Sequence, residues 1–174
     1  MESMEKLDST EYVRLTPDDW QKLRDLRIQA VTEQPKAFGN TPQEELSRTE
    51  EMWRDRLEKK TYLFAQEGDS LVGMVSVVPE LAEKTKHIAN IYSMYVVPES
   101  RGKGTARTLL TRAIEEAKVL HPEIVKLELN VAVTQLEALQ LYESLGFERA
   151  GYLRKELFVD GEFIDEIQME KFVG

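Results

Sequence analysis

The sequence predicts an α/β fold of the α+β kind, in which a central sheet of about seven strands is flanked by four helices. Two observations predict it. Apolar residues recur with helical spacing in four segments, and β-rich runs bounded by turn residues occupy seven others, in the order β-α-α-β-β-β-α-β-α-β-β. A chain of 174 residues can bury one sizeable core but is short for two full-size domains, so residues 1–174 are predicted to form a single domain.

The first third of the chain is predicted to hold one short strand and two helices. The strand covers residues 12–15, and a helix start follows at Thr16, where a capping residue precedes a proline and two aspartates. This helix is expected to end before Pro35, which halts the apolar period. A second helix is expected over residues 41–59, because its first threonine is followed three positions later by a glutamate that can close a capping box.

The middle of the chain changes from strands to a helix. Residues 62–66 and 71–78 are β-rich runs around a Glu-Gly-Asp-Ser turn at 67–70, which predicts a hairpin because the glycine takes a positive φ at little cost. A third strand over residues 88–97 ends at a proline, which cannot donate to a sheet ladder. From residue 101 to residue 120 the apolar residues follow one helical face.

The last third alternates strand and helix and closes with a hairpin. Residues 124–131 alternate apolar and polar side chains, which predicts a strand. A helix is expected over residues 134–145, capped by its first threonine and stopped by Gly146. Residues 149–172 are predicted to be two strands joined at Asp160-Gly161, a strong signal for a two-residue hairpin turn.

The composition excludes several classes of protein. Without cysteine the chain has no disulfide, thiolate nucleophile or thiolate metal site. A formal net charge of −9 argues against general nucleic-acid binding, although an acidic surface can favour a cationic acceptor such as an amine. No stretch approaches the roughly 18 apolar residues of a membrane helix, and residues 1–10 lack the apolar core of a secretory signal, so a cytoplasmic protein is expected. The two histidines, His87 and His121, have no metal-ligand spacing, and no metal is predicted.

The segment with the clearest chemistry is the loop that leads into the third helix. Two glycines, Gly102 and Gly104, stand just before that helix, where free backbone N–H groups and the helix dipole favour a bound phosphate. Three basic residues, Arg101, Lys103 and Arg107, add positive charge to an acidic chain. The spacing is neither that of a P-loop nor that of a dinucleotide-binding loop, and the alternative is a plain loop with solvated basic residues.

This loop resembles the cofactor motif of the GNAT superfamily of N-acetyltransferases, Arg/Gln-x-x-Gly-x-Gly/Ala, which residues 101–106 (RGKGTA) match. Residues 129–131 (LNV) and 138–147 (ALQLYESLGF) resemble the family's second signature, and the order of elements is similar too. The resemblance implies an acetyl-CoA-dependent N-acetyltransferase with a mixed, mostly antiparallel sheet and a homodimeric assembly. Residues 88–147 would form the cofactor-binding core, and the helical region 16–60 would lie on the acceptor side.

The resemblance also implies roles for individual residues. Tyr142 would be the general acid that protonates the departing thiolate, although a buried aromatic that packs a helix onto the sheet is an alternative. Gln135 stands where the family frequently has an asparagine that contacts the cofactor, and its side chain is one methylene longer. The pantetheine arm would run along Met94, Tyr95 and Val96, and the pyrophosphate would be bound by Arg101, Gly102, Lys103, Gly104, Thr105, Ala106 and Arg107.

The resemblance leaves the general base unassigned. Histone-type members use a glutamate on the cofactor strand, and the matching residue here is Asn90, so another carboxylate or a water chain would have to accept the amine proton. Glu128 and Asn130 share one face of their strand, and the solvated orientation is favoured for both. The expected reaction is direct attack of an amine on the thioester. A non-catalytic acyl-CoA-binding domain of the same fold is the alternative.

Overall fold

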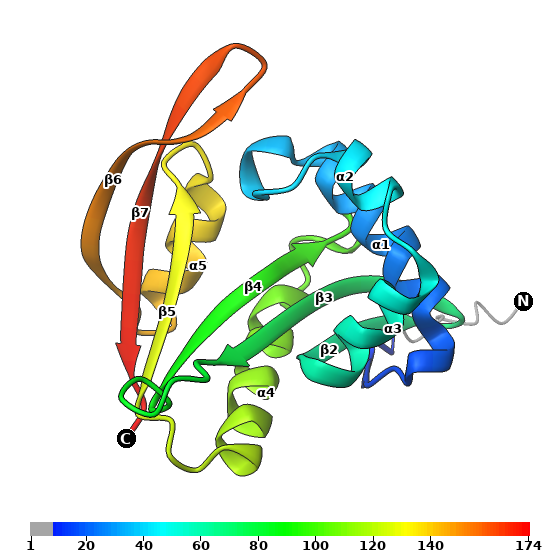
Figure 1. The fold of residues 1–174 in the computed structure, drawn as a ribbon, viewed down its shortest axis with the longest axis horizontal. Helices are drawn as coiled ribbons and strands as arrows, with labels where there is room; N and C mark the ends of the chain where they lie inside the picture. The colour runs from blue at the N-terminus through cyan, green and yellow to red at the C-terminus, as the bar shows by residue number, and fades with distance from the viewer. Residues whose placement is uncertain (1–8) are drawn as a thin grey trace, which may run out of the picture.

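The computed structural model describes residues 9–174, so most of the N-terminal stretch expected to lack a secretory signal lies outside it. All seven predicted strands are present and form one sheet in the order β1-β2-β3-β4-β5-β7-β6 (Figure 1). Only β4 and β5 pair in parallel, so the sheet is mixed and mostly antiparallel, as the resemblance implied. The strands are β1 (Glu11–Val13), β2 (Thr61–Glu67), β3 (Ser70–Pro79), β4 (Ile88–Val96), β5 (Lys126–Ala132), β6 (Glu148–Val159) and β7 (Glu162–Phe172).

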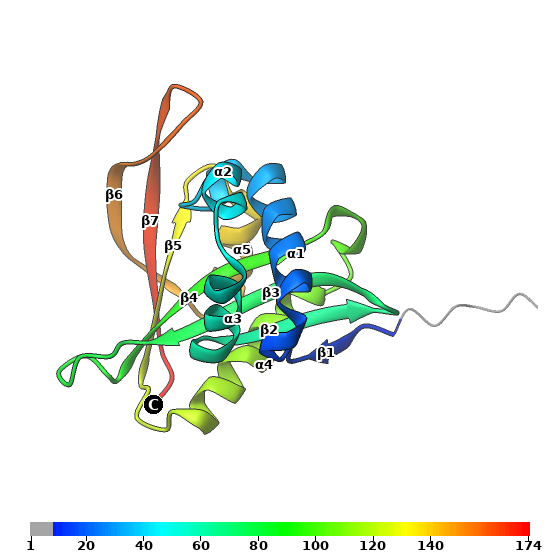
Figure 2. The same ribbon diagram turned by 45° about the vertical axis from the view of Figure 1, so that its right-hand side comes forward.

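Within residues 9–174, five α-helices flank the sheet where four were predicted. Figure 2 shows α1 and α3 on one face of the sheet and α4 on the other. In α4 the apolar residues Leu109 and Leu110 are fully buried, whereas Val119 and Leu120 at its C-terminal end are exposed. The helices are α1 (Trp20–Glu33), α2 (Pro42–Leu46), α3 (Glu50–Lys59), α4 (Thr105–Leu120) and α5 (Leu136–Ser144), with short 3-10 helices η1 (Pro17–Asp19), η2 (Pro35–Ala37) and η3 (Pro98–Ser100). None of the helices in the described part of the chain is long and apolar enough to span a membrane.

The fifth helix arises because the predicted helix over residues 41–59 is wrong as one element. The predicted capping box does form at Thr41, whose hydroxyl accepts a hydrogen bond from the Glu44 N–H at 3.2 Å. However, α2 ends after five residues, and Thr49 adopts an extended conformation and caps a new helix by accepting from the Met52 N–H at 3.3 Å. A second capping threonine followed by two glutamates was the sequence signal for this break.

Turn chemistry confirms the predicted hairpins and one helix end. In the β6–β7 turn both Asp160 and Gly161 have positive φ, 51° and 82°, as a type I′ turn requires. Gly146 closes α5 with a φ of 85°, and the Phe147 N–H returns to the Tyr142 carbonyl at 3.0 Å in a Schellman arrangement. The predicted start of α5 is wrong, because Gln135 occupies the capping position and Thr134 lies outside it.

Candidate active site

The sheet is forked between β4 and β5. These strands are paired only where Ile88–Asn90 meet Lys126–Glu128, and beyond that point they diverge (Figure 1). A bulge in β4 provides the physical reason, because Ser93 and Met94 together oppose the single residue Val75 of β3. Ser93 has a φ of 61°, and a bulge bends and twists the strand that contains it. The outer half of β4 therefore has an unpaired edge facing the fork.

The acceptor-side helices hold this bulge in place. Arg27 of α1 donates from Nη1 to the Ser93 hydroxyl at 2.9 Å, and the Tyr62 hydroxyl lies 3.3 Å from the same oxygen. Arg27 is itself fixed from behind, since its Nε donates to the Glu45 carboxylate at 3.0 Å. The side chains of Arg27 and Glu45 are both buried, so α1, α2 and the bulge form one connected polar network.

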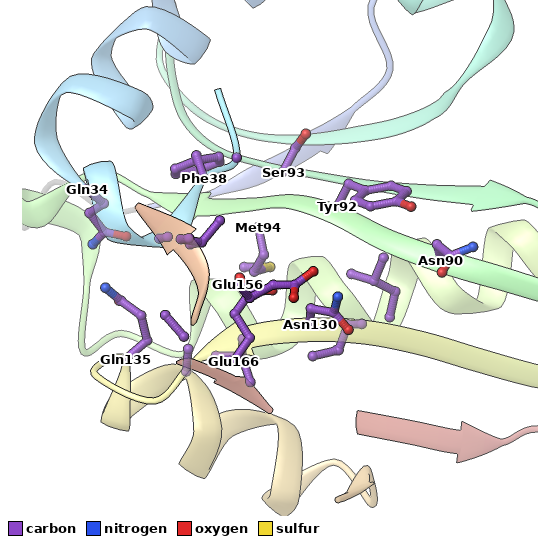
Figure 3. A pocket seen from close by; sticks show the side chains of 18 of the residues that line it. Gln34, Phe38, Asn90, Tyr92, Ser93, Met94, Asn130, Gln135, Glu156 and Glu166 are labelled. Atoms are coloured by element: carbon purple, nitrogen blue, oxygen red, sulfur yellow. The ribbon is translucent and has the colours of Figure 1, made fainter. Parts of the chain in front are cut away.

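A cavity of about 470 Å³ occupies the fork. On the α1–α2 side the cavity is lined by Arg27, Gln34 and Phe38. On the opposite side of the sheet it is lined by residues of α5. Figure 3 shows side chains from both sides pointing into the same space. The polar and aromatic residues that line it are Arg27, Gln34, Phe38, Asn40, Asn90, Tyr92, Ser93, Glu128, Asn130, Gln135, Tyr142, Glu156, Glu166 and Gln168.

Tyr142 lines this cavity from α5 and also packs in the core. Its side chain is 6% exposed, and its ring contacts Phe147 edge-on with centroids 5.8 Å apart. Burial raises the pKa of Tyr142, so the phenol stays protonated well above neutral pH. Tyr142 therefore packs α5 onto the sheet and also lines the cavity, so the packing role and the proton-donor role considered for it are compatible.

The start of α4 has the features of an anion site. Gly102 and Gly104 have φ values of 75° and 83°, a region that other residues rarely adopt. The helical hydrogen bonds begin with Thr108 N–H to Gly104 O at 3.1 Å, so the N–H groups of the preceding first-turn residues have no partner within the helix. This first turn contains no acidic residue, unlike those of α2 and α3. The predicted glycine roles are thus compatible with the backbone, while phosphate binding stays a prediction.

Two of the predicted basic residues already have protein partners. Arg101 donates from Nε to the Val96 carbonyl at 2.8 Å and forms an ion pair with Glu33 at 2.7 Å. Arg107 donates to the Ser144 hydroxyl at 2.6 Å, which joins α4 to the end of α5. Glu33 therefore offsets part of the positive charge expected from the sequence at this loop.

The predicted pantetheine residues point in different directions. Met94 lines the cavity, but the Tyr95 side chain points toward α1, where its hydroxyl donates to Glu33, and Val96 is buried. Any contact of Tyr95 and Val96 with the cofactor would have to come from their backbone. Asn90, at the narrow end of the fork, donates to the Glu80 carboxylate at 2.6 Å.

The sequence interpretation missed most of the acidic lining. The solvated orientation favoured for Glu128 and Asn130 is incomplete, because both line the cavity, where Glu128 is half-buried and Asn130 is exposed. Glu156 and Glu166 were not considered at all, and both lie there too (Figure 3). Strand alternation in β7 places Glu166 and Gln168 on the same face. Nothing in the sequence shows that the cavity between β4 and β5 lies against that face.

The glycine at the start of α4 gives a testable prediction. Gly104→Val adds a Cβ that meets no atom within 4 Å, so its whole effect comes from forcing a β-branched residue to φ 83°. We expect the turn to rearrange, the first amides of α4 to move, and the Kd for CoA in calorimetry to rise about tenfold, or ~1.4 kcal/mol. Gly68→Val, at φ 58° in the distant β2–β3 turn and equally free of contacts, is the matched control. An unchanged CoA affinity in Gly104→Val would contradict the anion-site assignment.

Solved structures identify the fold as that of acetyltransferases. A GNAT-family acetyltransferase from Streptococcus pneumoniae superposes with a TM-score of 0.84, covering 95% of this chain and 100% of that one at 20% sequence identity. A Salmonella typhimurium protein solved with its cofactor acetyl-CoA has a TM-score of 0.78 and covers 94% of each chain at 19% identity.

Sequence comparison establishes the family. The profile of the Acetyltransferase (GNAT) family matches residues 20–147, most of the chain. The spermidine N(1)-acetyltransferase of Vibrio cholerae is 30% identical over 132 residues, which cover 74% of this chain and 73% of that protein. The L-amino acid N-acetyltransferase of Escherichia coli is 26% identical over 148 residues, 83% of this chain and 89% of that protein. The chain belongs to the GNAT family of acyltransferases, and the resemblance drawn from residues 101–106 and 138–147 is confirmed.

Proposed function

We propose that this chain is a single acetyltransferase domain that transfers the acetyl group of acetyl-CoA to a primary amine by direct attack in a ternary complex. The forked sheet is the observation that carries the proposal. Its cavity has a buried tyrosine on the α5 side, polar and aromatic side chains on the α1–α2 side, and carboxylates from β5, β6 and β7. A donor and an acceptor can therefore enter from opposite sides and meet beside Tyr142.

The residues around the fork fit acetyl-CoA. Beyond Asn90 the edge of β4 that faces the fork has no strand partner, so backbone groups along Met94, Tyr95 and Val96 would pair with the amides of a pantetheine arm, with the Val96 carbonyl first released from Arg101. The first-turn amides of α4, with Arg101, Lys103 and Arg107 nearby, would bind the pyrophosphate. Gln135 lines the cavity beside α5 and would contact the arm through its amide.

The chemistry needs two proton transfers at this place. An amine must be neutral before it attacks the thioester carbonyl, and the departing thiolate needs a proton. Tyr142 is the residue proposed to give that proton to sulfur. Because burial disfavours the phenolate, Tyr142 must regain a proton from the attacking nitrogen as it gives one up. A chain without cysteine has no thiol for a covalent acetyl-enzyme.

An amine of positive charge fits the acceptor side best. The cavity is lined by the carboxylates of Glu128, Glu156 and Glu166, whereas its cation, Arg27, is already paired with Glu45. The names of the Vibrio cholerae and Escherichia coli relatives give spermidine and L-amino acids as their substrates. A polyamine has no carboxylate to be repelled by this lining, so we place polyamines ahead of amino acids as acceptors.

A non-catalytic acyl-CoA-binding domain is the second candidate. It is favoured by Asn90, an amide where histone-type members have the glutamate base, which is occupied with Glu80. The catalytic function is preferred because other carboxylates line the same cavity.

The deciding experiment measures free CoA released from acetyl-CoA in the presence of separate amine classes: polyamines, amino acids and peptide N-termini. We expect release above the buffer rate, fastest with a polyamine. If CoA at 100 times its Kd raises the free energy of unfolding by about 2.7 kcal/mol while no amine gives turnover, the binding-domain alternative is correct.

We also propose that the protein is a homodimer, and analytical ultracentrifugation of the same preparation measures its mass. A cytoplasmic location and the absence of a resident metal also stay predictions.

A further inference from the structure

A second bulge, in β6, shapes the acidic side of the cavity. Leu153 pairs with Glu166 and Leu157 pairs with Ile164, so three residues of β6 stand opposite the single residue Asp165 of β7. Lys155 in the bulge has a φ of 56°. Such a distortion needs partners that hold it, because a non-glycine residue at this φ is strained.

Asp165 supplies these partners. Its carboxylate accepts a hydrogen bond from the Lys155 backbone N–H at 2.7 Å and another from the Tyr152 hydroxyl at 2.7 Å. The two bonds use both oxygens of one side chain, and they fix the bulged segment to β7. The bulge is therefore a built feature of the hairpin rather than a loose loop.

The consequence of the bulge is a pair of carboxylates in the cavity. Glu156 comes directly after Lys155, and it lines the cavity together with Glu166 of β7 (Figure 3). We call Glu156 and Glu166 the carboxylate pair. Within residues 9–174 neither of these two side chains forms a hydrogen bond or an ion pair, whereas the nearby Glu128 pairs with Lys126 at 2.7 Å. The pair is thus uncompensated negative charge that faces the space beside Tyr142.

We propose that Glu166, with Glu156 set beside it by the Asp165-held bulge, accepts the proton of the incoming ammonium acceptor. This inference rests on the proposed acetyl transfer. The Glu166 carboxylate takes one proton from R–NH₃⁺, and the free amine forms the new C–N bond at the thioester carbonyl. When the C–S bond breaks, the remaining surplus proton on nitrogen passes through Tyr142 to the sulfur. The products are the acetamide, CoA thiol and one proton, which Glu166 releases to water.

The electrostatics of the cavity support this role. Burial and the charge of Glu156 raise the pKa of Glu166, which makes its carboxylate a better proton acceptor than an exposed glutamate. Arg27, the arginine that lines the cavity, directs its Nε at Glu45, a carboxylate that it shares with Arg48 and Arg56. The titratable residues that line the same cavity are Arg27 of α1, Tyr92 of β4, Glu128 of β5, Tyr142 of α5 and Glu156 of β6; Glu170, on the same face of β7, is paired with Lys126.

The test compares pH profiles of kcat/KM for four variants, with the amine that the wild-type enzyme acetylates best. We expect Glu166→Gln to lower kcat/KM at pH 7 at least tenfold and to abolish the acidic limb, so that the rate climbs steadily as the amine loses its own proton. Glu166→Asp should recover part of the rate. Glu156→Gln should move the acidic limb to lower pH, because removing the neighbouring charge lowers the pKa of Glu166. Glu170→Gln, on the same strand face but outside the cavity, is the control.

The outcomes separate this inference from the proposed function. Melting temperature and CoA affinity of Glu166→Gln should match the wild type, which excludes misfolding as the cause of a lost rate. An unchanged rate and pH profile in Glu166→Gln, with an active wild-type enzyme, would overturn the inference alone. A wild-type enzyme that acetylates no amine would overturn the proposed function and this inference with it.

Discussion

The Glu45→Gln variant is expected to lose about 3–5 kcal/mol of unfolding free energy, because it removes the buried anion that three arginines share. The Glu45 side chain is fully buried, and it accepts hydrogen bonds from Arg27 at 3.0 Å, Arg48 at 2.9 Å and Arg56 at 3.1 Å. The Arg27 and Arg56 side chains are only 8% and 13% exposed, so water cannot replace the lost partner. Chemical denaturation of both proteins at pH 7 measures the difference.

The pH dependence of stability gives a second readout of the same change. Burial alone would raise the pKa of Glu45, but the positive charges of Arg56 and Arg27 outweigh it and hold the pKa below its ordinary value of 4.5. The stabilisation by this carboxylate is therefore complete above about pH 4.5 and is lost as the pH falls through the lower, folded-state pKa. Glutamine has no carboxyl group to protonate, so the Glu45→Gln variant should not lose this part of the unfolding free energy as the pH falls below about 4.5.

Glu50→Gln is the matched control for this prediction. Glu50 also pairs with an arginine, Arg54 at 2.7 Å, but on the surface of α3, with side chains 55% and 38% exposed. Solvent screens such a pair, so its loss should change the stability by no more than about 1 kcal/mol. Equal effects of the two substitutions would contradict the claim that the buried cluster holds the acceptor-side helices together.

The cluster also connects stability with the site. Arg27 reaches from Glu45 to Ser93, the residue of positive φ in the β4 bulge, and the bulge opens the fork. The same arginine lines the cavity. Acceptor-side helices that loosen would therefore free the bulge as well, and a fall in acetyl-transfer rate should accompany the loss of stability.

The elements could be predicted from the sequence because their signals are local. The Asp160-Gly161 turn, the capping box at Thr41 and the stop at Gly146 each depend on residues within one turn of each other, and all three formed as expected. The predicted single helix over residues 41–59 failed because two adjacent start signals were taken as one. The second start signal is Thr49, which caps α3 after α2 has ended at Leu46.

The site could be predicted only where its chemistry is local. The two glycines before α4 are needed at their own positions, and both have the positive φ that their role requires. The acidic lining depends instead on two strand bulges, one at Ser93 and one at Lys155, in residues that have no intrinsic preference for positive φ. Alternation along a regular strand could not indicate that Glu156 faces the cavity, because the bulge shifts the register before it. The Glu33 partner of Arg101 lies 68 residues away in sequence and was equally invisible.

The Tyr142→Phe variant is expected to lower kcat at least about a hundredfold, or ~2.7 kcal/mol of barrier, since a positioned proton donor typically contributes 10²–10⁴-fold. The substitution removes one hydroxyl and keeps the ring that packs on Phe147, so the fold should be retained. KM for acetyl-CoA should change little, because the proton is transferred in the transition state and not in the ground state. Steady-state kinetics with saturating amine, together with CoA calorimetry, measure both quantities.

The pH profile distinguishes a proton donor from a packing residue. Because burial raises the pKa of Tyr142, the hydroxyl stays protonated beyond pH 10, and the wild-type kcat should not fall on the alkaline side through this group. Tyr12→Phe removes a hydroxyl from β1, at the edge of the sheet, and should leave kcat unchanged. If Tyr142→Phe loses less than about threefold in kcat, the barrier changes by under ~1 kcal/mol. In that case the thiolate takes its proton from elsewhere, and Tyr142 serves only to pack α5 onto the sheet.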